Sequence, residues 1–183
     1  MPEERRAATD EEARAIASPL RLRILRLCLD QPLTNKQIAD ELDRDPASVL
    51  HHVRTLVRTG FLAPDEERRG ARGAREVPYR ATGKSWTMEV VDPEQSRRKG
   101  IALVEAFFED ALRVGLDTVD STRLGLRLTE AEHDELTGRI AELVEEFKQR
   151  RSEGEPWSLF VALHRDDRPV PPSAKSGAAG AGA

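Results

Sequence analysis

The chain has 183 residues, with 29 Lys+Arg against 33 Asp+Glu and a formal net charge of −4 at pH 7. This length is enough for one sizeable domain or two small ones, and no apolar run approaches the ~20 residues of a membrane span. Residues 1–15 are highly charged and lack the apolar stretch of a signal peptide, and the single cysteine, Cys28, excludes an internal disulfide. Composition therefore predicts a cytoplasmic protein without a membrane partner.

The charge is divided unevenly along the chain. Residues 1–84 carry 16 basic and 14 acidic side chains, a net charge of +2, whereas residues 85–183 carry 13 and 19, a net charge of −6. Within residues 68–84, Glu76 is the one acid beside six basic residues: Arg68, Arg69, Arg72, Arg75, Arg80 and Lys84. Such a local positive patch indicates contact with nucleic acid, which the overall charge hides.

The first predicted helix begins at Ser18-Pro19, where a capping residue precedes a proline. Its apolar side chains recur at helical spacing: Leu20, Ile24, Leu27 and Cys28. Cys28 lies on this apolar face, which favours a buried structural thiol over a redox or metal sensor.

Two short helices are predicted next, joined by a tight turn. Thr34 caps the first, residues 35–42, which turns Ile38, Ala39 and Leu42 inward. Asp45 caps the second, residues 46–59, with Pro46 at its first position. Residues 43 and 44 connect them, so the pattern predicts a helix-turn-helix.

The 46–59 helix has two distinct faces. Val49, Val53 and Leu56 share the inner face, and Gly60 ends the helix. We call the opposite side the outer face; it consists of Ala47, Ser48, His51, Arg54, Thr55 and Arg58. It holds no acid, so it can enter a major groove without repelling phosphates, and Ser and His can reach base edges. Thr34 and Lys36 complete the candidate DNA contacts on the helix-turn-helix.

A basic loop follows between two predicted strands. Residues 61–63 and 77–81 pair around residues 64–76, here called the wing. The wing holds Gly70 and Gly73 together with four basic side chains: Arg68, Arg69, Arg72 and Arg75. A flexible basic loop on a two-stranded ribbon can touch phosphates or a minor groove.

Residues 17–62, ASPLRLRILRLCLDQPLTNKQIADELDRDPASVLHHVRTLVRTGFL, resemble the winged-helix domain of ArsR-type bacterial transcriptional regulators. The resemblance covers roughly residues 10–82. Its main elements are Pro19-Leu20-Arg21, Ile38-Ala39, His51-His52-Val53 with Leu56, and Gly60-Phe61-Leu62. It implies a homodimer that binds a palindromic operator in double-stranded DNA. Metal-sensing members carry Cys pairs or His/Asp/Glu sets, and the Cys-x-Cys form is missing here, so we expect no metal site and no cofactor.

The second half of the chain begins with a long predicted helix, residues 94 to about 120. Its apolar side chains form more than one stripe, too broad for one small neighbour to cover. We expect a second copy of the chain to bury this broad apolar surface, with Ile101, Val104, Phe107, Phe108 and Leu112 as its dimerisation residues.

A strand–helix–strand module is predicted after the long helix. Leu124, Leu126 and Leu128 alternate with polar residues or glycine, as in a half-buried strand. Thr129 and Glu132 form a capping box for a helix to about residue 151, and residues 157–164 form a second strand. The Pro-, Gly- and Ala-rich residues 165–183 predict a disordered tail.

Other interpretations of the remaining residues were weighed. His133 lies on an acid-rich helix surface, which favours a solvated side chain over a metal ligand, and Trp86 and Trp157 are expected to be core anchors. An enzyme would need a nucleophile–base pair, a metal set or a phosphate loop, and none is legible, so we expect no catalysis. The rival function is a winged helix that binds protein and has lost DNA binding, whose 46–59 helix would be acidic or apolar.

The sequence thus predicts a mainly α fold with a small β component (α+β). Residues 10–84 form a winged helix-turn-helix and residues 94–164 a dimerisation module, which is also the candidate site for a small-molecule effector; the sequence leaves open whether such an effector exists. The predicted function is that of a homodimeric repressor of transcription.

Overall fold

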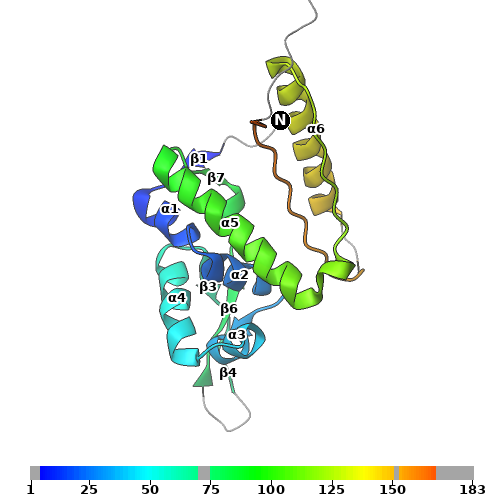
Figure 1. The fold of residues 1–183 in the computed structure, drawn as a ribbon. Helices are drawn as coiled ribbons and strands as arrows, with labels where there is room; N and C mark the ends of the chain where they lie inside the picture. Colours follow the sequence, from blue (N-terminus) through cyan, green and yellow to red (C-terminus); the bar gives the residue numbers. More distant parts are fainter. Residues whose placement is uncertain (1–4, 70–74, 151–152, 168–183) are drawn as a thin grey trace, which may run out of the picture. The chain divides into compact units, whose positions relative to one another are not determined.

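The computed structural model describes residues 5–69, 75–150 and 153–167, and the chain divides into two compact units, residues 1–119 and 120–183. The first unit holds five α-helices (Figure 1): α1 (Asp10–Ile16), α2 (Pro19–Leu27), α3 (Asn35–Leu42), α4 (Pro46–Arg58) and α5 (Pro93–Val114). The second unit holds α6 (Glu130–Gln149). The long helix α5 therefore belongs to the unit of the helix-turn-helix, whereas the sequence grouped it with the residues that follow. In the described residues, no helix is long and apolar enough to cross a membrane.

The helix starts are fixed by local capping. Thr9 with Glu12 caps α1, and Thr34 with Gln37 caps α3, each in a reciprocal capping box. The Asp45 carboxylate accepts a hydrogen bond from the Ser48 N–H at the start of α4. The predicted limits of α3 are confirmed, and those of α4 are confirmed to within one residue.

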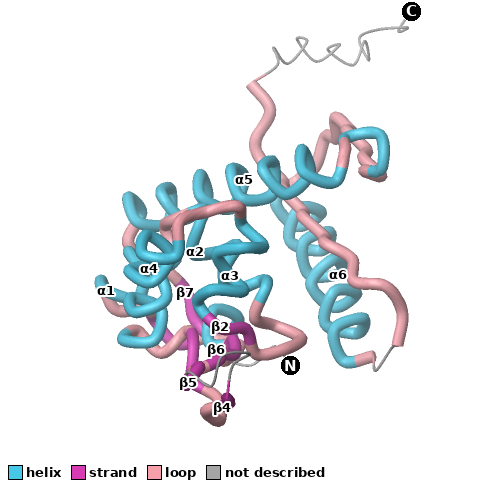
Figure 2. The backbone as a smooth tube through the Cα atoms, turned by 90° about the horizontal axis from the view of Figure 1, so that it is seen from below, coloured by secondary structure: helices cyan, strands magenta, loops and turns pink. Residues whose placement is uncertain are grey.

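The described strands form three small sheets beside the helices. Figure 2 draws the strands in magenta. In the largest sheet, β6 (Pro78–Ala81) lies between β2 (Leu33–Thr34) and β3 (Leu62–Pro64), and both pairings are antiparallel. The predicted pairing of 61–63 with 77–81 is thus confirmed, with Leu62 opposite Ala81. The other sheets pair β4 (Arg68–Arg69) with β5 (Arg75–Glu76), and β1 (Arg6–Ala7) with β7 (Met88–Glu89) in parallel.

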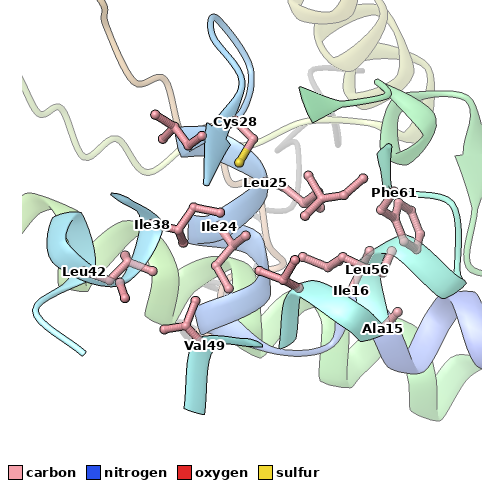
Figure 3. Packing of buried hydrophobic residues seen from close by; sticks show 14 of the residues in the cluster. Ala15, Ile16, Ile24, Leu25, Cys28, Ile38, Leu42, Val49, Leu56 and Phe61 are labelled. Atoms are coloured by element: carbon pink, nitrogen blue, oxygen red, sulfur yellow. The ribbon is translucent and has the colours of Figure 1, made fainter. Parts of the chain in front are cut away.

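The core of the first unit lies among α1, α2, α3 and α4, and it includes the fully buried Phe61 (Figure 3). The predicted inner residues of the helix-turn-helix are all buried there: Ile38, Ala39, Leu42, Val49, Val53 and Leu56. Burying an aliphatic side chain of this size stabilises the fold by about 1.5–3 kcal/mol. This core holds α4 with its polar side outward, which is a winged helix-turn-helix arrangement.

Helix α5 packs on α1 and α2 through small residues. Ala102, Ala106 and Ala111 are buried, whereas the larger apolar side chains of the helix lie mostly outside this contact. The helix ends at Val114, where Gly115 takes a positive φ of 96°. The prediction that it continues to about residue 120 was therefore wrong, because Gly115 turns the chain into a short 3-10 helix at Leu116–Thr118.

The second unit contains the predicted α6 but neither predicted strand. The segments that precede and follow α6, including residues 124–128 and 157–164, contain no strand among the described residues. Alternation of apolar and polar residues alone does not make a strand, because strand formation depends on packing against neighbouring strands. Trp157 is 79% exposed and Trp86 48% exposed, so the expectation that both tryptophans anchor a core was also wrong. Most of the predicted disordered tail, residues 168–183, lies outside the described residues.

Candidate nucleic-acid interface

The turn between α3 and α4 is fixed by two contacts. Asp43 adopts a left-handed conformation with φ 51°, and the Arg44 N–H donates to the Ala39 carbonyl at 2.9 Å. Across the turn, the Asn35 side-chain Nδ2 donates to the Pro46 carbonyl at 2.8 Å. This bond joins the first turns of the two helices and sets their relative orientation. The sequence analysis missed Asn35, since its partner is a backbone carbonyl with no sequence signal.

The outer face of α4 emerges as the sequence predicted it. Ala47, Ser48, His51, Arg54 and Arg58 are exposed, and Thr55 is half-buried. The Thr55 hydroxyl donates to the His51 carbonyl at 3.0 Å, one turn back in the helix. The face therefore brings together five exposed side chains on one rigid element, and none of them is acidic.

Two arginines of this face differ in their surroundings. The Arg58 Nε donates to the Glu11 carboxylate of α1 at 2.8 Å, and both side chains are largely exposed. Arg54 makes no ion pair among the residues the structure describes. Arg54 is thus the freer cation on α4, while Arg58 would have to exchange Glu11 for a phosphate.

The adjacent histidines separate into an outer and an inner one. Their rings meet edge to face with centroids 5.7 Å apart, and His51 is exposed while His52 is half-buried. Burial, followed by the positive charge of Arg21 and the neighbouring His51, lowers the pKa of His52. His52 is therefore neutral at pH 7, and His51 is the histidine available to a ligand at the surface.

The two candidates at the start of α3, the N-cap Thr34 and Lys36, differ in exposure. Thr34 is only 5% exposed, and its hydroxyl accepts from the Gln37 N–H at 3.2 Å. This burial corrects the expectation of a direct DNA contact: Thr34 fixes the start of α3 instead. Lys36 is exposed and pairs with Asp40 one turn later.

The described ends of the wing form a pair of short strands, β4 and β5, while residues 70–74 lie outside the described residues. The β4–β5 ladder places Arg69 opposite Arg75. The Arg68 Nη2 donates to the Gln37 side chain of α3 at 2.6 Å, and Arg75 lies 3.6 Å from Glu67. Arg72 lies outside the described residues. The wing base is thus attached to the helix that precedes α4.

Cys28 is fully buried, and burial raises the pKa of its thiol to about 11. A thiol in this state is a poor metal ligand or nucleophile at neutral pH. Within residues 5–69, 75–150 and 153–167, no group of three or more His, Cys, Asp or Glu side chains could hold a metal ion.

Four of the five predicted dimerisation residues are exposed on one side of α5. Ile101, Val104, Phe108 and Leu112 are each 45–54% exposed, whereas Phe107 is half-buried. The spacing of three or four residues places the exposed four in a continuous stripe. This stripe lies outside the small-residue contact with α1 and α2.

One family model matches part of the first unit. Residues 16–64, which include α2, α3, α4 and β3, match the family model described as "Helix-turn-helix domain". A search of the curated proteins gave no match.

Several solved structures are similar to this chain at low identity. A possible transcriptional regulator for arsenical resistance is 21% identical over 62% of this chain and 100% of its own, with a TM-score of 0.33. ZitR from Lactococcus lactis, in apo form, is 20% identical over 74% of this chain and 86% of its own, with a TM-score of 0.31. MepR from S. aureus, in complex with DNA, is 14% identical over 76% of this chain and 80% of its own, with a TM-score of 0.26. Values this low carry no argument. The two capped helices and the turn between them form a helix-turn-helix, and this region is similar to the helix-turn-helix family model.

Proposed function

We propose that the protein is a homodimeric winged-helix regulator that represses transcription by binding a palindromic DNA site. The observation that carries this proposal is the outer face of α4: five of its six side chains are exposed, none is acidic, and the helix is capped at Asp45. Inserted in a major groove, its first turn would bring Ala47 and Ser48 to the bases, followed by His51 one turn later.

The cations at the rim of this face would contact the phosphates. Arg54 is exposed on α4, and Arg68 and Arg75 are exposed on the wing strands. The pairs Arg58–Glu11 and Arg75–Glu67 are solvent-exposed, so replacing the carboxylate with a phosphate costs little. Each phosphate neutralised in this way releases counterions, which makes binding depend on salt.

The α5 stripe supports the homodimer. Four large apolar side chains exposed on one helix are costly for a soluble monomer, and a two-fold partner would bury them. The same partner would present two α4 helices to successive major grooves, about 34–36 Å apart. Two weak half-site contacts would then act as one strong contact.

The test is binding of the full chain to genomic DNA fragments, followed by footprinting of the retained sites. We expect palindromic footprints and an affinity that falls steeply with salt, with a preference over random DNA of at least 10³-fold. Binding to DNA with no sequence preference would refute the regulator, and no DNA binding at any salt concentration would favour the protein-binding winged helix.

A further inference from the structure

The residues after α6 expose an unusual amount of apolar surface. Trp157, Leu159, Val161 and Leu163 are 79, 72, 51 and 45% exposed, and on α6 itself Leu143 and Phe147 are more than half exposed. None of the described residues between 120 and 167 is buried. A unit with no core of its own gains stability only by burying this surface against something else.

The net negative charge of the second unit indicates which class of macromolecule could cover its apolar surface. Residues 120–183 carry 12 acidic and 9 basic side chains, a net charge of −3. Nucleic acid and anionic membrane surfaces are negatively charged, so both would be repelled. A protein surface is the remaining macromolecular partner.

The order of residues in this segment fits a second copy of itself. The four exposed apolar residues occupy alternate positions, with Glu155 before the first and Arg165 after the last, also in the alternate register. In a strand, all six side chains would share one face. The segment thus has an apolar middle and opposite charges at its two ends, which is the pattern that an antiparallel pair of identical strands requires.

We propose that residues 155–165 form a strand that pairs antiparallel with residues 155–165 of a second copy, about a two-fold axis at Phe160. This register places Trp157 opposite Leu163 and Leu159 opposite Val161. It also places Glu155 opposite Arg165 at both ends, so that each charge faces its opposite. The inference rests on the homodimer proposed above and gives it a contact separate from α5.

Pro156 fixes one further detail of the pairing. A proline has no N–H to donate to a ladder, so it must occupy a non-hydrogen-bonded pair, here opposite His164. Because pair types alternate, the Phe160–Phe160 pair is then also non-hydrogen-bonded, with Cα atoms about 4.5 Å apart. That separation is within the range of a disulfide.

Site-specific crosslinking tests this register. A Phe160→Cys chain should form a disulfide-linked dimer under mild oxidation, seen on a non-reducing gel. The wild type should form none, because Cys28 is buried. Leu163→Cys is the matched control, since antiparallel pairing separates the two copies of residue 163 by about 20 Å. Equal crosslinking at 160 and 163 would overturn the proposal, because in-register parallel pairing or random collision would produce it.

A second pair of variants guards against a Phe160→Cys chain that folds poorly. Ser158 should lie opposite Ala162 of the partner, so a mixture of Ser158→Cys and Ala162→Cys chains should crosslink several-fold more than either chain alone. No excess in the mixture, in a protein that sediments as a dimer and binds DNA, would refute the strand pairing and leave the proposed function standing. Crosslinking at the predicted positions in a protein that binds no DNA would support the strand pairing and refute the proposed function.

Discussion

The guanidinium of Arg23, on α2, donates a hydrogen bond to Asp110, on α5, over 2.8 Å, while its Nη1 lies 2.6 Å from Glu109. Arg23 is only 7% exposed, although α2 otherwise contributes apolar side chains to the core. Ion pairs thus join α5, which carries the exposed apolar stripe, to α2, which packs against the helix-turn-helix. Removal of this arginine would leave two carboxylates without their cation at a packed interface.

We therefore expect Arg23→Met to lower the free energy of unfolding by about 1–3 kcal/mol. The loss should be smaller than for a fully buried pair, because the side chains of Glu109 and Asp110 are 46 and 21% exposed. Urea denaturation followed by circular dichroism measures it. Arg97→Met, which removes the solvent-exposed pair with Glu94, is the control and should cost less than about 1 kcal/mol. Equal losses in the two variants would mean that the Arg23 ion pairs stabilise the fold no more than a solvent-exposed pair does.

On α4, His51→Ala should weaken binding to the cognate DNA site by about 1–3 kcal/mol and affect random DNA much less. The reason is that His51 is exposed on the outer face, where its ring can reach a base edge. Titration of both DNAs by fluorescence anisotropy gives the two affinities. His133→Ala, an exposed histidine of α6, should change neither. A similar loss on both DNAs would move His51 to the phosphate backbone.

Replacement of Arg68, Arg69, Arg72 and Arg75 by alanine should weaken binding to all DNA sequences alike. Each lost phosphate contact should reduce the slope of log K against log salt by about 0.9. The measurement is a salt titration on cognate and random duplexes. The control is Arg139→Ala, which removes an exposed arginine of α6 and should leave the slope unchanged. A quadruple variant with the wild-type slope would remove the wing from the interface.

Phe108→Glu should give folded monomers with greatly weakened operator binding. The substitution places a charge in the middle of the α5 stripe, where a partner would have to bury it. Sedimentation reports the assembly, and circular dichroism reports the fold. Ser96→Glu adds the same charge at an exposed position near the start of α5, and it should remain dimeric. A Phe108→Glu chain that stays dimeric and binds tightly would place the interface elsewhere.

Stability should depend on pH through Glu12. The hydrogen bond from Arg6, with help from Lys84 and the Thr9 N–H, holds the pKa of this nearly buried carboxyl far below its ordinary value of 4.5. A carboxyl with a depressed pKa in the folded state stabilises the protein above its unfolded pKa, and this contribution is lost as the pH falls.

We therefore expect the free energy of unfolding to decrease as the pH is lowered from about 5 towards 2, and Glu12→Gln to lose part of that dependence. Urea denaturation at pH 7 and pH 3 measures the difference. Glu142→Gln, on the exposed surface of α6, should keep the wild-type dependence. Parallel pH profiles for Glu12→Gln and the wild type would contradict the assignment.

The elements that could be predicted from the sequence are those with local causes. Thr34, Asp45 and the period of Val49, Val53 and Leu56 define α3 and α4 without reference to the rest of the chain. Gly115 was also a legible local signal, and the end of α5 was misplaced because the apolar periodicity continues past it.

The features that were missed depend on distant residues. The two-residue strands β1 and β2 exist because β7 and β6 lie beside them, and two residues carry no periodicity of their own. Arg23 contacts Glu109 and Asp110, which follow it by 86 and 87 positions in the sequence. Nothing in the sequence near Arg23 indicates these partners. For the residues around α6 the opposite error occurred. Alternation predicted strands at 124–128 and 157–164, but strand formation also depends on packing against a neighbouring strand, and the described residues there form none.

Strand β6 has a mechanical consequence. It pairs with β2 at Thr34, the residue that caps α3, and it pairs with β3, from which the chain continues into the wing. The Arg68–Gln37 hydrogen bond adds a second brace between the wing and α3. These contacts hold the wing base at a fixed position relative to the helix-turn-helix. If α4 and the wing both touch DNA, the distance between their contacts is set by the protein, and the DNA must bend or twist to meet it.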